Sequence, residues 1–206
     1  MKTVVVHPER CVGCMQCMSA CAVAHSQGKT IYAAVAEEPR TSPRIHVGPG
    51  PGNFAFPNKC RHCDPAPCMG ACMPRALVRD AMTSAVLVDP SRCIDCGMCA
   101  MACPFGVIRY RADWRVPGRR AVAVKCDNCS DRQKEGRGPA CVETCLVKAL
   151  EFGDPNELLR DETRRLALQV TLGLREGAAV RRETEAVALW RALGEKQAAA
   201  SAQSSA

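Results

Sequence analysis

Residues 93–104 read Cys93-Ile94-Asp95-Cys96-Gly97-Met98-Cys99-Ala100-Met101-Ala102-Cys103-Pro104, and this stretch decides the fold. Its spacing, C-x2-C-x2-C-x3-C, places four thiols within eleven residues. The first three can wrap around one small inorganic cluster as a tight loop, while the fourth lies just beyond, at the start of a helix, and points the other way. Structural zinc sites instead use paired knuckles with a longer spacer between them. The stretch therefore predicts iron–sulfur ligands.

The same kind of pattern recurs along the chain, because all sixteen cysteines fall into four groups of four. Groups one and three share the spacing above, whereas group two is C-x2-C-x4-C-x3-C and group four is C-x2-C-x11-C-x3-C. Sixteen ligands in this order predict four [4Fe–4S] clusters and argue against a secreted disulfide scaffold. Group four, taken alone, also fits a zinc site. The groups are Cys11, Cys14, Cys17 and Cys21; Cys60, Cys63, Cys68 and Cys72; Cys93, Cys96, Cys99 and Cys103; and Cys126, Cys129, Cys141 and Cys145.

Bound clusters would change the net charge of the protein and therefore the kind of partner that the charge predicts. The formal charge of +7 at pH 7 would by itself favour an acidic partner such as nucleic acid. A [4Fe–4S] core held by four thiolates carries about −2, so four of them contribute roughly −8 and leave the loaded protein near about −1. We interpret the excess of lysine and arginine as compensation for this charge. Aromatic residues make up only 4% of the chain, too few for a base-stacking surface, so no nucleic-acid partner is expected.

The start of the chain and its apolar segments predict a cytoplasmic location. Residues 1–8 have neither the long apolar core nor the small-residue cleavage site of a secretory leader. No apolar stretch approaches the ~20 residues that a membrane span requires. We therefore expect no membrane span, and a reducing compartment in which thiols remain available for iron.

Short strand-like segments flank the cysteine groups and predict an α+β fold. Group two is separated from group one by a connection over residues 24–59, and a second connection spans 104–125. Because Gly48-Pro49-Gly50-Pro51-Gly52 cannot form helix or a paired central strand, we expect a surface loop there. The expected strands are Thr3–Val6, Arg44–Val47, Ala85–Val88, Val107–Tyr110, Ala121–Val124 and Ala149–Phe152.

The composition changes after Asp154, where cysteines stop and Leu, Ala, Arg and Glu dominate. Asp154-Pro155-Asn156-Glu157 is a typical helix start, with an N-cap acid followed by proline. Leu159, Leu166, Val170 and Leu174 fall on one helical face, and a second helical stretch carries Ala186, Leu189, Trp190 and Leu193. We predict a cysteine domain over 1–153, a helical extension over 154–194 that binds a partner or a second copy, and a disordered tail over 195–206.

The cysteine region resembles the four-cluster ferredoxin subunits of multi-subunit oxidoreductases. That family includes the iron–sulfur subunits of formate dehydrogenases, dimethyl sulfoxide reductase, hydrogenase complexes, carbon monoxide dehydrogenase and tungsten aldehyde oxidoreductases. The resemblance covers about residues 3–153 and implies two ferredoxin-like modules, a pseudo-repeat, that bind four [4Fe–4S] clusters. The segments that carry it are 60–68, 88–106, 125–129 and 138–141.

The resemblance also implies how ligands are shared, because groups one and four exchange their fourth cysteine in that family, as do groups two and three. Three of the prolines that often follow the closing cysteines are replaced here, by Ala22, Met73 and Leu146. This affects the local loop shape and leaves the expected ligation unchanged. The implied sets are Cys11, Cys14, Cys17 and Cys145 for cluster 1; Cys60, Cys63, Cys68 and Cys103 for cluster 2; Cys93, Cys96, Cys99 and Cys72 for cluster 3; and Cys126, Cys129, Cys141 and Cys21 for cluster 4.

The expected function is electron transfer without catalysis. A larger catalytic subunit of the tungsten, molybdenum or nickel–iron type is the expected partner, together with a flavin subunit as a further candidate. Residues 17–26 resemble the subclass that serves carbon monoxide dehydrogenases and tungsten aldehyde oxidoreductases, and the latter is the preferred expectation. Formate dehydrogenase and hydrogenase complexes, a free-standing polyferredoxin and a cluster-bearing regulator are the alternatives.

Three smaller signals complete the expectations. The methionines within the groups are interpreted as filling space around the clusters. We assign Arg61-His62 a structural or partner-facing role, and we expect His25 to be a surface or capping residue.

Overall fold

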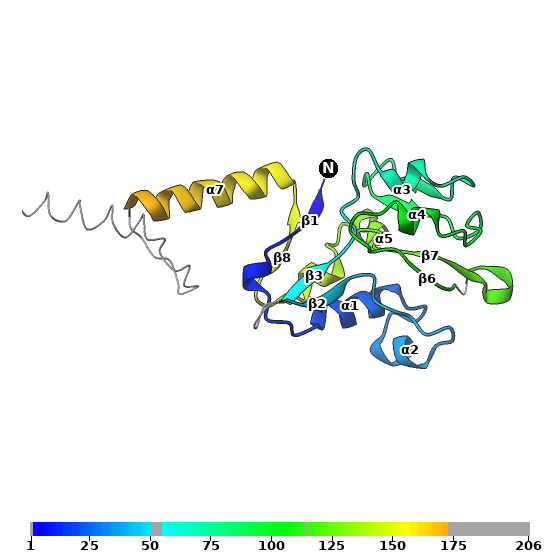
Figure 1. Ribbon diagram of the computed structural model, residues 1–206. Coiled ribbons are helices and arrows are strands. Elements are labelled where there is room, and N and C mark those ends of the chain that lie inside the picture. Colours follow the sequence, from blue (N-terminus) through cyan, green and yellow to red (C-terminus); the bar gives the residue numbers. More distant parts are fainter. Residues whose placement is uncertain (1, 51–54, 114, 173–206) are drawn as a thin grey trace, which may run out of the picture. The chain divides into compact units, whose positions relative to one another are not determined.

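The computed structural model describes residues 2–50, 55–113 and 115–172 (Figure 1). Contacts divide the chain into two compact units, Met1–Pro155 and Asn156–Ala206, which we describe separately. The first unit holds all sixteen cysteines, and none of them forms a disulfide. It mixes short strands with short helices, as the α+β prediction requires.

Every strand in the described part of the first unit belongs to a two-stranded antiparallel ribbon. One ribbon joins the two ends of the unit, since β1 and β8 lie side by side although they are at its start and its finish (Figure 1). The other ribbons are hairpins of neighbouring strands. The pairs are β1 (Thr3–Val6) with β8 (Leu150–Gly153), β2 (His46–Pro49) with β3 (Ala55–Asn58), β4 (Leu77–Arg79) with β5 (Val86–Val88), and β6 (Arg109–Ala112) with β7 (Ala121–Val124).

The helices of the first unit follow the cysteine groups. The third cysteine of each group lies on a helix, and in three groups the fourth cysteine follows the end of that helix. Short helices are expected here because each one only has to carry the chain from one ligand to the next. The cysteine helices are α1 (Gln16–His25), α3 (Pro67–Gly70), α4 (Met98–Met101) and α6 (Ala140–Glu143); the others are α2 (Ile31–Ala36), α5 (Ser130–Lys134) and the 3-10 turns η1 (Pro8–Arg10) and η2 (Pro117–Arg119).

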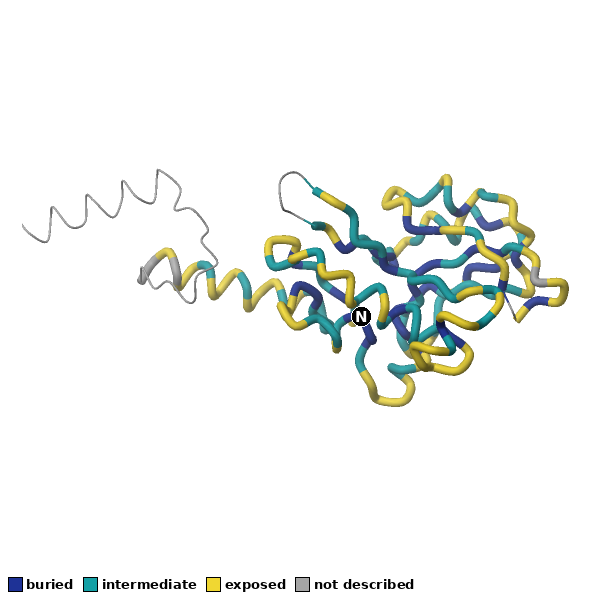
Figure 2. The backbone as a smooth tube through the Cα atoms, turned by 90° about the horizontal axis from the view of Figure 1, so that it is seen from below, coloured by how far each residue is buried: buried dark blue, intermediate teal, exposed yellow. Residues whose placement is uncertain are grey.

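The first unit has two main core clusters, and cysteine side chains belong to both. We call the part around cysteine groups one and four the outer module and the part around groups two and three the middle module. In the outer module, Val4 of β1 and Leu150 of β8 pack with Ile45, Cys21 and Cys141. A larger cluster in the middle of the sequence contains Leu77, Val86, Ile108 and Val122 with Cys72, Cys93 and Cys99. Figure 2 shows buried segments inside these ribbons and exposed residues on the loops. A third, small cluster of Cys60, Val107 and Cys126 joins the two modules.

The structure departs from the sequence expectation mainly in the connections. The predicted strands at Thr3–Val6 and Ala121–Val124 are confirmed, but the strand predicted at Arg44–Val47 begins two residues later, at His46. Gly48 and Pro49 belong to this strand, so the expected loop begins after Pro49; a proline at a strand end is tolerated because it lies in a ribbon with a free edge. β3, β4 and α2 have no counterpart among the predicted elements, because residues 31–36 and 55–58 fall in the predicted connection and β4 is only three residues long.

The described part of the second unit is residues 156–172, which belong to α7 (Pro155–Leu172). This helix starts at the proline of the Asp154-Pro155 signal. Leu159, Leu168 and Val170 are exposed on it. The predicted second helical stretch and the tail over 195–206 lie outside the described residues. Of the helices in the described ranges, none combines the length and the apolar character that crossing a bilayer demands.

The β1–β8 ribbon predicts a matched pair of leucine substitutions. Leu150→Ala removes a side chain that is 2% exposed and packs against the core around Cys21 and Cys141. It should lower the free energy of unfolding by about 2–5 kcal/mol, measured by chemical denaturation. Leu146→Ala is the control, because Leu146 is 84% exposed in the same segment and should change stability by less than about 0.5 kcal/mol. Equal effects would contradict the packing described.

Candidate iron–sulfur sites

The sixteen cysteines approach one another in four sets, each of which draws on two groups. Burial together with the neighbouring thiols of Cys11, Cys14 and Cys145 raises the pKa of Cys17 to about 11. Because such an influence falls with distance, the last cysteine of group four lies beside the first three of group one. Cys17 and Cys145 also pack against the same core cluster. Cys11, Cys14, Cys17 and Cys145 therefore form one set.

The remaining cysteines of groups one and four meet in the same way. Burial and then Cys126, Cys21 and Cys129 raise the pKa of Cys141 well above its usual value. Burial with Cys126 and Cys129 nearby raises the pKa of Cys21 to about 12. Cys21 thus completes a set whose other three members come from the end of the domain.

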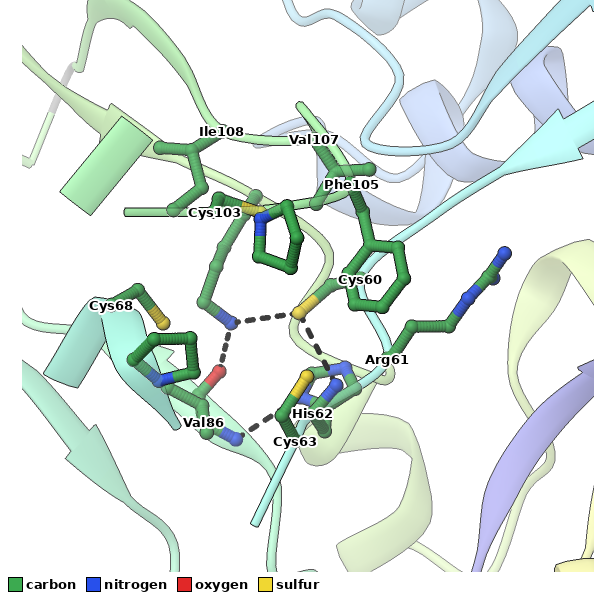
Figure 3. A pocket seen from close by; sticks show the side chains of 13 residues that line it. Cys60, Arg61, His62, Cys63, Cys68, Val86, Cys103, Phe105, Val107 and Ile108 are labelled. Atoms are coloured by element: carbon green, nitrogen blue, oxygen red, sulfur yellow. Dashed lines mark hydrogen bonds between the residues drawn. The ribbon is translucent and has the colours of Figure 1, made fainter. Parts of the chain in front are cut away.

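Cysteines of groups two and three also lie close to one another. Burial, followed by the thiols of Cys72, Cys93 and Cys96, raises the pKa of Cys99, whose Sγ also accepts a hydrogen bond from the Tyr110 hydroxyl at 3.0 Å. The other set lines a small cavity, to which Val86 and Ile108 add an apolar wall. In Figure 3 the side chains of Cys60, Cys63, Cys68 and Cys103 face this cavity.

One backbone device recurs in all four groups. The residue before the second cysteine has a positive φ in every case, +71° at Gly13, +52° at His62, +59° at Asp95 and +59° at Asn128. Glycine, aspartate, asparagine and histidine are the residue types that enter this left-handed region most readily. The turn directs backbone N–H groups at sulfur: His62 N lies 3.4 Å from Cys60 Sγ, and Asn128 N lies 3.4 Å from Cys126 Sγ.

A second device follows the closing cysteines. Ala76 N and Ala149 N each donate to the sulfur four residues earlier, Cys72 and Cys145, both at 3.2 Å. Cys21 has no such turn after it because α1 continues to His25. Its sulfur accepts instead from Arg44 N at 3.3 Å. The connection over 24–59 therefore supplies a donor that group one lacks, which sequence spacing could not indicate.

His62 has a structural role, one of the two roles expected for it. It is 1% exposed, and burial, with Lys125 and Lys59 nearby, lowers its pKa to about 2. The ring is therefore neutral, and its Nδ1 accepts a hydrogen bond from Val86 N at 3.0 Å (Figure 3). Its neighbour Arg61 lies over the rings of Phe56 and Phe105, with the guanidinium carbon 5.6 and 5.4 Å from the ring centres. This stacking covers one side of the cavity.

Of the two roles expected for His25, capping is confirmed, because it is the last residue of α1 and contacts a carbonyl oxygen of the preceding turn. It is not a surface residue, because its side chain is 11% exposed and lies in a polar cluster between groups one and four. Its Nε2 is 3.1 Å from both carboxylate oxygens of Asp127, and its Nδ1 is 2.7 Å from the Cys21 carbonyl oxygen. Arg44 Nη1 also contacts Asp127, at 2.5 Å. Burial alone would raise the pKa of Asp127, but His25 and Arg44 hold it well below its usual range. Asp127 thus fixes α1 and the connection beside Cys126 and Cys129.

The residues present fit [4Fe–4S] clusters. Four soft thiol donors surround each site, which is the ligand set that such clusters use. The Nζ of Lys59 supplies an independent sign: it is buried and makes no hydrogen bond within the described part of the chain. A buried ammonium without an anion is unfavourable, and a negatively charged cluster on the nearby Cys126 and Cys141 thiols would supply that anion. The sequence contained a signal for this residue, since Lys-Cys-x-x-Cys opens groups two and four alike.

Comparison with known proteins supports this chemistry. Residues 52–155 match a family described as 4Fe-4S dicluster domain, and residues 4–21 match a 4Fe-4S binding domain. An iron-sulfur protein of Rhodospirillum rubrum is 40% identical over 157 residues, which cover 73% of this chain and 81% of that protein. In Escherichia coli K12, formate hydrogenlyase subunit 2 is 32% identical over 80% of this chain and 88% of that protein. Electron transport protein HydN of the same strain is 36% identical over 80% of this chain and 97% of that protein.

The contacts of Asp127 with His25 and Arg44 predict that Asp127→Asn lowers the stability of the protein. Asp127→Asn leaves His25 and Arg44 without their carboxylate and should lower the free energy of unfolding by about 1–3 kcal/mol at pH 7. Asp131→Asn, at an exposed position on α5, is the matched control and should cost less than about 0.5 kcal/mol. Chemical denaturation of the two variants side by side measures both. A stable Asp127→Asn variant would show that the polar cluster does not hold α1 in place.

Proposed function

Because this chain belongs to the 4Fe-4S dicluster domain family of iron–sulfur electron-transfer subunits, we propose that it carries electrons through four [4Fe–4S] clusters to or from a catalytic subunit. The observation that carries the proposal is the cavity lined by Cys60, Cys63, Cys68 and Cys103. Three of these cysteines are consecutive in group two and the fourth closes group three, so the site is built for ligand sharing. A [4Fe–4S] cluster held by these residues would supply one-electron transfer.

We propose that the four sets described above are the ligand sets. Their supports are the mutual influence of the thiols on one another and the shared core clusters. The assignment is Cys11, Cys14, Cys17 and Cys145 for cluster 1; Cys60, Cys63, Cys68 and Cys103 for cluster 2; Cys72, Cys93, Cys96 and Cys99 for cluster 3; and Cys21, Cys126, Cys129 and Cys141 for cluster 4.

The contacts between sets favour the order 1, 4, 2, 3 along the path of the electron. Cys17 and Cys145 of cluster 1 pack on the same core as Cys21 and Cys141 of cluster 4. Cys126 of cluster 4 packs with Cys60 of cluster 2. Cys68 and Cys103 of cluster 2 pack against the core that holds the cluster 3 ligands. Clusters 1 and 3 are the ends of this path, and each has one exposed ligand, Cys14 or Cys96, through which a partner can exchange electrons.

The protein's own groups hold the clusters and adjust how readily they are reduced. Backbone N–H groups and the Tyr110 hydroxyl donate hydrogen bonds to the sulfurs, which stabilises the negative charge that reduction adds. Apolar side chains such as Val86 and Val107 keep water from the middle of the path. This arrangement serves electron transfer, and bond chemistry belongs to the partner.

The partner that we propose is a catalytic oxidoreductase subunit. The relative named formate hydrogenlyase subunit 2 favours a partner of the formate or hydrogenase type. The tungsten aldehyde oxidoreductase type, preferred from the resemblance of residues 17–26, is the second candidate, and a flavin subunit is a further candidate for the opposite end of the path. We assign attachment to the helical extension over 154–194, because α7 exposes Leu159, Leu168 and Val170.

Ligand sharing predicts the iron content of paired serine variants. The wild-type protein, purified without oxygen, should contain about sixteen irons per chain. Cys14→Ser combined with Cys145→Ser should lose about four irons, since both residues belong to cluster 1. Cys141→Ser combined with Cys145→Ser should lose about eight, although these two cysteines are close in sequence. Iron analysis and electron paramagnetic resonance measure both, and the reverse result would show that each group holds its own cluster.

Removal of the extension tests the attachment of the partner. A chain that ends at Asp154 should keep its iron but lose its catalytic subunit during anaerobic affinity purification, whereas the full chain should retain it. The Leu159→Ala and Val170→Ala double variant is a smaller change on the same exposed face, and it should weaken the association at least tenfold. An unchanged complex mass after truncation would exclude α7 as the attachment site.

A further inference from the structure

Two buried lysines, Lys59 and Lys125, lie at the junction of the two modules, and neither is a ligand of the proposed clusters. Lys59 is 0% exposed and Lys125 is 3% exposed. Within the described ranges they are the only lysines or arginines that are buried. Each stands directly before the first cysteine of a group, Cys60 or Cys126. Buried lysines are rare because removing an ammonium from water is costly unless an anion compensates for it.

The side chain of Lys125 reaches the other module's ligands. Its backbone continues into Cys126 of cluster 4, but its Nζ lies 3.6 Å from Cys60 Sγ of cluster 2. The same ammonium donates to the carbonyl oxygen of Val86 and, at 3.1 Å, to that of Cys126. It also faces the cluster 2 cavity, which it lines together with all four cysteines of that set. Lys125 therefore compensates negative charge at cluster 2, although in the sequence it directly precedes group four.

Lys59 does the reverse. Its backbone continues into Cys60 of cluster 2, and Cys60 packs directly against Cys126 of cluster 4. The buried ammonium of Lys59 lies near the thiols of Cys126 and Cys141, two ligands of the cluster 4 set. Its Nζ makes no hydrogen bond to any described residue. The charge of the Cys21, Cys126, Cys129 and Cys141 set is the compensation that this ammonium requires.

We propose that Lys59 and Lys125 raise the reduction potentials of the two inner clusters. Each lysine directly precedes a ligand of one inner cluster but places its positive charge beside the other: Lys59 acts on cluster 4, and Lys125 acts on cluster 2. The inference rests on the proposed function. Reduction takes a cluster from about −2 to about −3, and a fixed ammonium in a medium of low dielectric stabilises the reduced form more than the oxidised form. Clusters 1 and 3 have no buried lysine among their described neighbours. Clusters 4 and 2 should therefore be reduced more readily than clusters 1 and 3.

The test is a set of midpoint potentials measured by electron paramagnetic resonance on the anaerobically purified full chain. Lys125→Met should make reduction of cluster 2 at least tenfold less favourable, which is about 59 mV for one electron. Lys59→Met should do the same to cluster 4. The signals are assigned with Cys68→Ser, which removes cluster 2, and Cys141→Ser, which removes cluster 4. Lys125→Arg and Lys59→Arg, which keep the charge, should show much smaller shifts, and Lys134→Met, at an exposed lysine on α5, should show none.

The outcomes separate this inference from the proposed function. A wild-type chain with far fewer than about sixteen irons overturns the proposed function itself. Full iron content with unchanged potentials in both methionine variants overturns the inference alone, and so does a shift of cluster 4 in Lys125→Met with cluster 2 unaffected. If the methionine variants fail to assemble, the wild-type order of potentials decides: inner clusters that are reduced after the outer two contradict the proposal.

Discussion

A cage of four thiols around one cluster can be completed only if the chain returns to it, and this constraint shapes the whole first unit. In the proposed ligand sets, each group supplies three cysteines to one cluster and the fourth cysteine comes from another group. The β1–β8 ribbon brings the last group back to the first, while β4–β5 and β6–β7 fold the middle groups onto each other. The short helices carry the chain between ligands and have little other purpose. Secondary structure here serves the placement of sulfur.

Gathering so many anionic sulfurs creates a second demand, which the interior meets at three levels. Left-handed turns at Gly13, His62, Asp95 and Asn128 shape the loops, and at His62 and Asn128 they direct amides at the first sulfur of the group. The Arg44–Asp127–His25 cluster holds the backbone that supplies a donor to Cys21. Lys59 and Lys125 add whole charges where the modules meet. Two of the positive charges that contribute to the formal charge of +7 therefore lie in the interior, where water cannot screen them.

The sequence predicted the parts of this molecule that depend on spacing. The cysteine groups, the first strand and β7 needed only local pattern. β3 and β4 could not be predicted, because short ribbon strands bury too few residues to show alternation. His25 and Asp127 are 102 residues apart in the chain, so no local motif could indicate their contact. The left-handed residues were visible as Gly, Asp and Asn before the second cysteines, and the paired Lys-Cys openings were visible as well.

The pairing of β1 with β8 also bears on the order in which the protein is made. During synthesis Thr3–Val6 emerges before all sixteen cysteines, whereas its partner Leu150–Gly153 emerges only after every one of them has been translated. The middle module, from Cys60 to Val124, has all its ribbon strands much earlier and can form while the ribosome is still working. The outer module cannot form until Leu150–Gly153 has been translated. A nascent chain that stalls before residue 145 would therefore present a folded middle and an unpaired, thiol-rich beginning, which is the state that a cluster-assembly machinery or a protease would meet first.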